Sequence, residues 1–421
     1  MRPKMSFAAA AVLCSGMLSA WTTAASSGRD QPDDELPITG KADPRLAAFD
    51  RLMTDFIKKN RLPGGALAVA KNGRIVYARG FGYADVDEME PVQPDSLFRI
   101  ASISKPFTAV AILQLVERGK LDLDDKVFDV LELRAPRGAK GKFDKRWKDV
   151  TILELLQHRG GWDRDKSFDP MFRSPTICKE LDVDPPADQD AIICYMLRQP
   201  LDFDPGERYA YSNFGYCLLG RVVEKVSESG YEGYVKKEIL APLGIEQMRL
   251  GKTLLKDRAP GEVHYYDKGD APAVMGPRLG KRVPEPYGAW CLEAMDSHGG
   301  WIASAPDLAR FASAFNDPKT CKILSEKSIA TMFARPPGAA DRDEEGYYGC
   351  GWWVGSTDEG AADAWHSGSL PGTSTLLVHR RDGLTWAVLF NSRQGKGGQP
   401  ANLVDPLLRD AADAVNHWPG E

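Results

Sequence analysis

The sequence is poor in the residue groupings that metal centres and redox sites require. Its six histidines are scattered over 421 residues, and none of its seven cysteines forms a C-x-x-C pair. We therefore expect no metal site and no cofactor, because zinc and redox motifs keep their ligands at short, fixed spacings. No serine lies in a G-x-S-x-G sequence, which leaves a nucleophile elbow or a chymotrypsin-like triad unsupported.

An excess of positive charge is also missing. Lysine and arginine number 54 against 59 aspartate and glutamate residues, which gives a formal net charge of −5. This balance offers no electrostatic reason to expect nucleic acid or an anionic membrane as a partner. The composition, 43% hydrophobic and 27% charged, is typical of a folded soluble protein with a large core.

After the N-terminus the sequence has no apolar run long enough to span a membrane. A basic start at residues 2–4 precedes an apolar stretch at 5–21, and small residues follow at 22–27. This layout predicts a signal peptide over residues 1–25, cleaved after Ala25, and hence a secreted or periplasmic protein. A membrane-spanning helix is the alternative, but the stretch is short and rich in alanine and serine.

Two features near the N-terminus bear on how the mature chain begins. Cys14 could carry a lipid anchor, but the bulky Leu13 stands where such anchors usually have a small residue, so we favour clean secretion. Residues 26–42 are polar, with acidic residues and proline, and predict a flexible linker. The folded domain is therefore expected over residues 43–417.

An oxidising compartment would allow disulfides among the cysteines of the mature chain. Six cysteines permit 15 pairings, which the sequence alone does not resolve. A Cys178–Cys194 bridge is our first expectation, because both residues lie in one excursion between helices. Cys217 lies in an apolar helical segment and is expected to be a buried free thiol. The six are Cys178, Cys194, Cys217, Cys291, Cys321 and Cys350.

Strand patterns gather at the two ends of the chain. Asp43-Pro44 opens an amphipathic helix to Ile57, and two strands joined by Asn72-Gly73 follow it. Four more strands and a closing helix end the chain. The six expected strands are 65–71, 74–79, 348–355, 364–368, 373–380 and 384–391, and the last helix is 401–417.

Helical patterns dominate the middle of the chain. The fold class predicted is therefore α+β, with one antiparallel sheet built from both chain ends and flanked by helices. The sheet subdomain should comprise residues 43–101 and 292–417, and a mainly helical subdomain, 102–291, is inserted. Helices are expected after the Thr151–Glu154 capping box and at 187–199, 214–227, 231–240 and 304–315, with a loop at 251–287.

Ser102 opens a long apolar run and has Lys105 three residues later. Residues three apart in a helix are neighbours, so the amine can assist the hydroxyl as a nucleophile. The apolar surroundings would lower the pKa of Lys105 and favour its neutral form. The first-turn N–H groups then face a developing oxyanion. The alternative is that Ser102 caps a helix and Lys105 is solvated.

Tyr211 and Asn213 lie just before another helix, and alternate positions place both side chains on one side. The phenol could accept the serine proton as a phenolate if cations stabilise it, and otherwise relays protons as a neutral hydroxyl. The alternative is that Asn213 merely caps the helix and Tyr211 is a packed aromatic residue.

A strand-like segment carries His366, Gly368 and Ser369. His366 would supply a donor or a positive charge to a substrate carboxylate, and Gly368 would remove a side chain that blocks the substrate. The N–H of Ser369 could complete an oxyanion hole. The alternative for His366 is a structural role, and for His158 and His298, which precede glycine pairs, we favour turn stabilisation.

The three motifs in order, S-x-x-K at 102, Y-S-N at 211 and H-S-G at 366, resemble those of the serine β-lactamases and penicillin-recognising DD-peptidases. The similarity is greatest to the class C branch and its esterase and peptidase relatives. It extends from about residue 46 to the last helix, through Pro205-Gly206, 242–244 and Gly299-Gly300. The third motif departs from the K-T-G of these β-lactamases, which disfavours β-lactamase activity.

The resemblance implies an acyl-enzyme on Ser102, with Lys105 and Tyr211 handling protons. Asn213 would hold the substrate amide, and the N–H groups of Ser102 and Ser369 would bind the oxyanion. The implied substrate is a small molecule or peptide: a D-amino-acid peptide or amide for a DD-peptidase-like enzyme, an ester for an esterase, or a β-lactam. A non-catalytic binding relative is a further alternative, and the oligomeric state is not implied.

Overall fold

The computed structural model describes most of the chain after residue 35. The predicted signal peptide, Cys14 and residues 26–35 of the predicted linker lie outside the described residues, which are 36–136, 143–337, 346–355 and 363–420. None of the helices in these ranges combines the length and apolarity needed to cross a lipid bilayer. Leu36–Glu421 forms one compact unit, within which both predicted subdomains fall.

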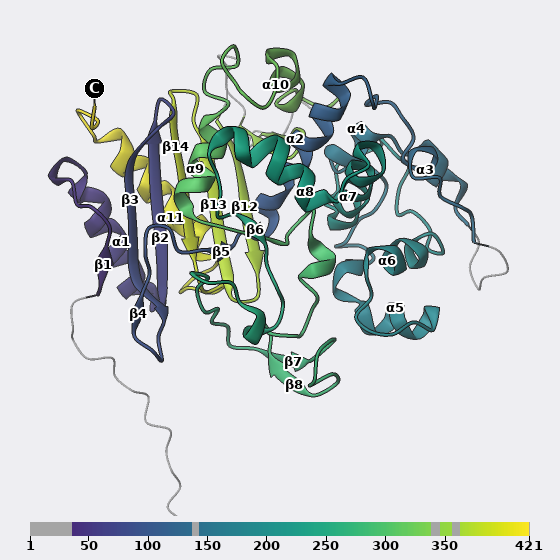
Figure 1. Ribbon diagram of the computed structural model, residues 1–421, viewed down its shortest axis with the longest axis horizontal. Coiled ribbons are helices and arrows are strands. Elements are labelled where there is room, and N and C mark those ends of the chain that lie inside the picture. Colours follow the sequence, from purple (N-terminus) through teal and green to yellow (C-terminus); the bar gives the residue numbers. More distant parts are fainter. Residues whose placement is uncertain (1–35, 137–142, 338–345, 356–362, 421) are drawn as a thin grey trace, which may run out of the picture. The chain divides into compact units, whose positions relative to one another are not determined.

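An antiparallel sheet forms the centre of the fold (Figure 1). Strands from the N-terminal and C-terminal parts of the chain join where β2 pairs with β14, so the predicted sheet from both chain ends is confirmed. The strand order is β1-β3-β2-β14-β13-β12-β11-β10, with β4 paired to β3. Their bounds are β1 Ile38–Thr39, β2 Gly64–Lys71, β3 Arg74–Asp85, β4 Glu90–Pro91, β10 Tyr347–Tyr348, β11 Trp353–Val354, β12 Ala364–Leu370, β13 Thr373–His379 and β14 Leu384–Phe390.

The two faces of the sheet carry different side chains because successive residues of a strand alternate between faces. Leu67 and Val69 of β2 pack in an apolar cluster with the helices α1 (Ala47–Asn60) and α11 (Pro400–Asp413). On the other face, β2 contributes only alanines, at 66, 68 and 70, to the larger core cluster. Small side chains let the helix α9 (Ala305–Ser313) lie close against the sheet.

The helices follow the predicted order. The Thr151–Glu154 capping box is present, α7 (Asn213–Ser227) coincides with the predicted helix, and the expected 231–240 helix is α8 (Tyr231–Val235) continued by a π-helical turn. The others are α2 Ser104–Glu117, α3 Val127–Val130, α4 Ile152–Leu156, α5 Ser174–Leu181, α6 Gln189–Met196 and α10 Glu326–Met332.

Several boundaries differ from the sequence-based expectation: β3 runs to Asp85 instead of the expected residue 79, and α11 ends at Asp413 instead of the expected residue 417. Three further differences change an element. The predicted linker ends too late, because Ile38–Thr39 pairs with β3 and the Thr39 hydroxyl donates to the Val92 carbonyl at 2.5 Å. The strand expected at 348–355 is two short strands, β10 and β11, joined in a hairpin. The loop expected at 251–287 contains the hairpin of β7 (Asp270–Pro272) and β8 (Arg282–Pro284).

The expected Cys178–Cys194 disulfide is wrong. Both residues are free thiols, and Cys178 is buried while Cys194 is exposed on the neighbouring helix. The Cys178 thiol instead lies 3.8 Å from the carbonyl oxygen of Asp184, so it packs inward within its own excursion. Cys217 is a buried free thiol, as predicted, and burial raises its pKa.

Candidate active site

Ser102 lies on a sharp turn between a short strand and a helix. The strand β5 (Phe98–Arg99) pairs with β9 (Trp301–Ala303), a 3₁₀ turn at Ala101–Ile103 follows, and α2 begins at Ser104. Ala101 has a φ of 48°, in the left-handed region, which costs a non-glycine residue about 1–2 kcal/mol. The surrounding structure must therefore hold this turn in place.

The turn is held from the sheet by two threonine hydroxyls of β13. Thr373 donates to the Arg99 carbonyl at 2.9 Å, and Thr375 donates to the Ile100 carbonyl at 3.0 Å. A Cβ on Gly368 would lie 2.2 Å from that same Ile100 oxygen. The prediction that Gly368 leaves room for the substrate is therefore corrected. The space that its side chain would occupy is filled by the backbone of the turn that carries Ser102.

Lys105 is fully buried at the start of α2. Its Nζ lies 3.0 Å from Ser102 Oγ, 2.8 Å from Asn213 Oδ1 and 3.0 Å from the His298 carbonyl oxygen. Burial holds the pKa of Lys105 well below its ordinary value, and the positive charge of Arg164 lowers it further against the opposing effect of Asp169. The alternative of a solvated Lys105 is therefore wrong.

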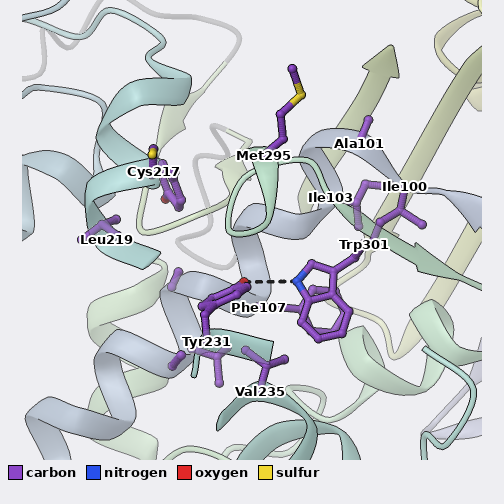
Figure 2. Close-up of a cluster of buried hydrophobic side chains, with 14 of the residues drawn as sticks. Ile100, Ala101, Ile103, Phe107, Cys217, Leu219, Tyr231, Val235, Met295 and Trp301 are labelled. Atoms are coloured by element: carbon purple, nitrogen blue, oxygen red, sulfur yellow. Dashed lines mark hydrogen bonds between the residues drawn. The ribbon is translucent and has the colours of Figure 1, made fainter. Parts of the chain in front are cut away.

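An apolar cluster surrounds the first turns of α2 (Figure 2). Ile103 and Phe107 of this segment are completely buried, together with Trp301 of β9. Within the cluster, Tyr231 links the elements through its hydroxyl, which lies 2.7 Å from Thr108 Oγ1 and accepts from Trp301 Nε1 at 3.2 Å. This packing fixes the helix that carries Lys105 and explains the low polarity around the amine.

Ser212 caps α7, because its hydroxyl accepts from the Gly215 N–H at 3.2 Å. The alternative in which Asn213 serves only as the cap is therefore wrong. Asn213 is the first helical residue, and its Nδ2 donates to Asp169 Oδ2 at 2.6 Å while its Oδ1 faces Lys105. Both ends of the Asn213 amide are thus engaged within the protein.

Tyr211 lies beside both Ser102 and Lys105. Its phenol is hydrogen-bonded to Ser102, and its ring centroid lies 4.7 Å from Lys105 Nζ and 4.4 Å from the guanidinium carbon of Arg164. Burial raises the pKa of Tyr211 above its ordinary value, although its hydrogen bond with Ser102 and the charge of Arg164 act in the opposite direction. The phenol is therefore neutral at physiological pH.

His366 is buried and neutral. Its Nδ1 lies 2.7 Å from the Ser367 carbonyl oxygen, which can only accept, so Nδ1 carries the proton and Nε2 accepts from the Tyr348 hydroxyl at 2.9 Å. Burial and the nearby Lys105 lower the pKa of His366 to about 3. The predicted positive charge at this position is therefore wrong, and both ring nitrogens are already engaged.

His158 and His298 both contribute to turns that border the site. His158 has a φ of 54° and its carbonyl accepts from the Ala210 N–H at 2.8 Å, which confirms the turn role. Its ring also packs on Tyr211, with centroids 4.3 Å apart. Burial lowers the pKa of both histidines well below the ordinary value. His298 additionally presents its carbonyl to Lys105, a role that the sequence did not indicate.

Ser369 lies on β12, opposite Ser374 in the ladder. Its Oγ is buried and has no hydrogen-bond partner among the described residues. The oxyanion hole formed by the N–H groups of Ser102 and Ser369 stays a prediction. In the described part of the chain, no three His, Cys, Asp or Glu side chains converge as metal ligands would.

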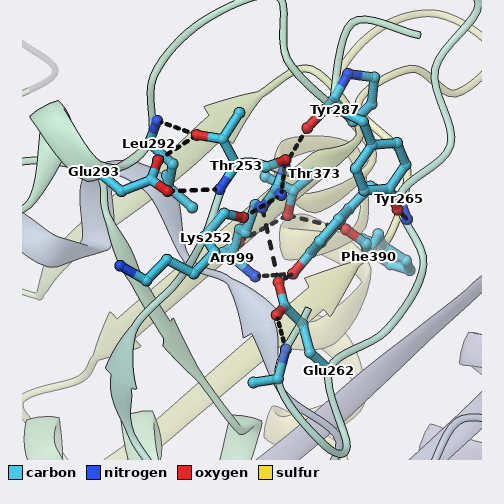
Figure 3. A network of polar contacts seen from close by, with 12 residues as sticks. Arg99, Lys252, Thr253, Glu262, Tyr265, Tyr287, Leu292, Glu293, Thr373 and Phe390 are labelled. Carbon is cyan, nitrogen blue, oxygen red and sulfur yellow. Dashed lines mark hydrogen bonds and ion pairs between the residues drawn. The ribbon is translucent and has the colours of Figure 1, made fainter. Parts of the chain in front are cut away.

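A second buried cation, Arg99, lies just before the turn (Figure 3). Its guanidinium donates to the carbonyl oxygens of Pro286 at 2.7 Å and Lys252 at 2.8 Å, and its Nε lies 3.7 Å from Glu262 Oε1. The Tyr265 ring covers it at 4.3 Å. Arg99 therefore ties the 251–287 segment to the strand that leads to Ser102.

Sequence reasoning missed Asp169, Arg164 and Arg99. Asp169 precedes a proline and caps a 3₁₀ turn by accepting from the Met171 N–H, so its sequence context indicates only a cap. Arg99 offered one signal, since an arginine between the apolar Phe98 and Ile100 requires buried partners.

Comparison with known proteins gives a consistent result over most of the chain. The model of the Beta-lactamase family matches residues 49–408. Penicillin-binding protein 4* of Bacillus subtilis is 30% identical over 336 residues, which cover 77% of this chain and 67% of that protein. Protein flp of Staphylococcus aureus is 26% identical over 78% of this chain, but the chain spans only 59% of its length.

A solved structure of a penicillin-binding protein homologue is also similar to this protein. The octameric penicillin-binding protein homologue from Pyrococcus abyssi superposes with a TM-score of 0.67 and 28% identity, over 87% of this chain and 77% of that one. Together with the family match over residues 49–408, these similarities show that the chain belongs to the beta-lactamase family, whose members share the fold of serine β-lactamases and penicillin-binding proteins.

Proposed function

We propose that this protein is a serine hydrolase that forms an acyl-enzyme on Ser102. The observation that carries the proposal is the 3.0 Å contact between Lys105 Nζ and Ser102 Oγ in a buried site. A serine hydroxyl needs a base within hydrogen-bond reach, and a lysine serves as one only when it is neutral at the working pH. The lowered pKa of Lys105 favours that neutral form.

The three contacts of Lys105 Nζ can be made by an ammonium or by the neutral amine that the reaction needs. A neutral amine has two N–H donors and one lone pair, whereas an ammonium has three donors and no acceptor. The Asn213 amide oxygen and the His298 carbonyl oxygen can only accept, so they take the two N–H groups. In the neutral amine the lone pair is then free to accept the hydroxyl proton of Ser102, whereas an ammonium would donate its third N–H to the same oxygen.

The chemical steps follow from this arrangement. Ser102 Oγ attacks the carbonyl carbon of the substrate while its proton passes to Lys105 Nζ, and the predicted N–H groups of Ser102 and Ser369 stabilise the oxyanion. Collapse of this intermediate breaks the bond to the leaving group, which takes the proton from Lys105 through the neutral Tyr211 phenol. Water then hydrolyses the acyl-enzyme, with the same groups moving protons in reverse.

The substrate class that we favour is a D-amino-acid peptide or amide, as for a DD-peptidase or D-amino-acid peptidase, outside the cytoplasm. Two observations support it: the His366-Ser367-Gly368 motif and the similarity to penicillin-binding protein 4*. A carboxylesterase is the second candidate and a β-lactamase the third. The peptidase, esterase and β-lactamase candidates all require that Ser102 is acylated, whereas a non-catalytic binding protein of this fold would not be.

Covalent labelling tests the nucleophile. The protein should react with a fluorophosphonate probe and with penicillin, and Ser102→Ala should abolish both adducts in intact-protein mass spectrometry. Ser104→Ala is the matched control, since Ser104 lies two residues away and its Oγ only accepts from the Trp301 N–H at 3.4 Å. Labelling that survives in Ser102→Ala would contradict the proposal.

Parallel assays separate the substrate classes. A D-Ala-D-Ala peptide, p-nitrophenyl butyrate and nitrocefin should be compared at equal enzyme concentration, and we expect the peptide to give the highest kcat/KM. A higher value for the butyrate would favour the esterase, and a higher value for nitrocefin the β-lactamase. N-terminal sequencing of exported protein tests secretion, with a start at residue 26 as the expected result.

A further inference from the structure

Two basic side chains, Lys105 and Arg164, contact the Tyr211 ring, and of these two only Arg164 is open to solvent. Lys105 is fully buried, whereas the Arg164 side chain is 40% exposed and its guanidinium carbon lies 4.4 Å from the ring centroid. His366 is neutral and does not supply the charge that a substrate anion would require. We propose that Arg164 recognises a negatively charged group on the acyl part of the substrate.

The guanidinium of Arg164 is not neutralised by a strong ion pair. Its Nε lies 3.8 Å from Asp165 Oδ1, and the Asp165 side chain is 89% exposed. Such exposed, loosely oriented pairs contribute about 0–1 kcal/mol, so the planar donor groups of Arg164 stay available to a ligand. The contrast is Arg208, equally exposed at 42% but paired with Asp163 at 2.8 Å.

The position of Arg164 indicates which part of the substrate it meets. Arg164 and Asp169 belong to the same loop, and Asp169 holds the Asn213 amide, whose other end contacts Lys105. Asn213 thus bridges the reactive pair and this loop. Arg164 also lies against the ring of Tyr211, whose phenol contacts Ser102, so the guanidinium is near the place that an acyl group on Ser102 would occupy. The inference rests on the proposed acylation of Ser102, and it specifies further that the acyl group carries a negative charge.

A pair of penicillins isolates that charge. Benzylpenicillin and its α-carboxy analogue share the β-lactam ring and the ring carboxylate, and differ by one carboxylate on the acyl side chain. The ratio of their second-order rate constants for acylating Ser102, measured by intact-protein mass spectrometry, reports recognition of that carboxylate. Any effect of Arg164 on the pKa of Lys105 is common to both reagents and cancels in the ratio.

Removing the positive charge should lower the preference for the α-carboxy penicillin. We expect Arg164→Gln to reduce the ratio by about tenfold, the effect of losing one charged contact of moderate strength. Arg164→Lys should retain part of it, and Asp165→Asn should increase it by removing the competing carboxylate. Arg208→Gln, the matched control of equal exposure, should leave the ratio unchanged.

Each other outcome overturns the inference. An unchanged ratio in Arg164→Gln removes Arg164 from recognition of the acyl group. An equal fall for both penicillins assigns Arg164 to the shared ring carboxylate or to the acylation chemistry. Fluorophosphonate labelling of Ser102 keeps this test separate from the proposed function: if Ser102 reacts with the phosphonate but with neither penicillin, the acyl-group inference fails and the nucleophile assignment stands.

Discussion

Arg99 and Lys105 are buried basic residues six positions apart on either side of the same turn, yet their surroundings differ completely. Arg99 faces the Glu262 carboxylate, several carbonyl oxygens and the ring of Tyr265. Lys105 faces a hydroxyl and two neutral carbonyl-type oxygens. A guanidinium keeps its charge in proteins and needs such compensation, whereas a lysine can lose its proton.

This difference in surroundings corresponds to a structural role for Arg99 and to the chemical role that we propose for Lys105. Arg99, whose charge is compensated, fixes the backbone that leads into the turn, and Lys105, which has no carboxylate in contact, is the residue that we propose as the base next to Ser102. Burial is nearly the same for both, at 1% exposure for Arg99 and 0% for Lys105. On this proposal the chemistry of the partners, more than the depth in the protein, determines which of the two residues takes part in the reaction. The predictions below test this contrast, beginning with the largest expected effect.

Lys105→Met should lower the acylation rate of Ser102 by about 10²–10⁴-fold, the usual contribution of a positioned base. Methionine has a similar length and no proton-accepting nitrogen. Stopped-flow or mass-spectrometric acylation kinetics measure the effect, and urea unfolding should still give a single cooperative transition. Acylation at the wild-type rate would show that Lys105, like Arg99, has a structural role and no role as the base.

Arg99→Met should destabilise the fold by about 3–5 kcal/mol, because it leaves the buried Glu262 carboxylate without its positive partner. The free energy of unfolding from urea titration measures this loss. Lys236→Met is the control, since the exposed Lys236–Glu232 pair should contribute less than about 1 kcal/mol. A loss no larger than in the control would mean that Arg99 is not structural, and the contrast with Lys105 would disappear.

Much of this contrast lay beyond what the sequence could predict. The pairing of Ser102 with Lys105 is local, three residues apart on a helix, and the apolar run around it already indicated burial and a neutral amine. The carboxylate that compensates Arg99 comes from Glu262, more than 160 residues away. Only the tertiary fold brings it there, so no spacing in the sequence could have identified it.

The fold itself was more predictable than the site. Alternating apolar residues and the Asn72-Gly73 turn identified the sheet from both chain ends, because strand patterns are short and repeat every two residues. The charge state of His366 was not predictable, since it depends on Tyr348 and on burial by elements that the motif does not include. Likewise, the disulfide was wrong because a shared excursion says nothing of side-chain direction.

Gly368→Ala tests whether support of the turn also comes from the sheet. The new Cβ would lie 2.2 Å from the Ile100 oxygen, so β12 or the turn must shift, at a cost of about 1–3 kcal/mol. We expect a lower free energy of unfolding together with slower acylation. Gly233→Ala is the control: a Cβ there meets only Ser229 Oγ, at 3.7 Å, and alanine favours the helix. Equal behaviour of the two variants would contradict the role given to Gly368.

A further prediction concerns the pH dependence of stability that Lys105 contributes. Because its pKa is lowered in the folded state from 10.5, the unfolded chain binds one more proton between the folded pKa and 10.5. Stability must then rise with pH across that window, by up to about 1.4 kcal/mol per pH unit, and fall as the pH drops toward the folded pKa. Lys105→Met should remove this slope, so the difference in unfolding free energy between wild type and variant should change steadily as the pH is lowered from 10.5. If the stabilities of wild type and Lys105→Met change in parallel with pH, Lys105 keeps its proton in the folded protein. Lys105 would then be a buried charged residue, as Arg99 is, and the proposed difference between the two would be wrong.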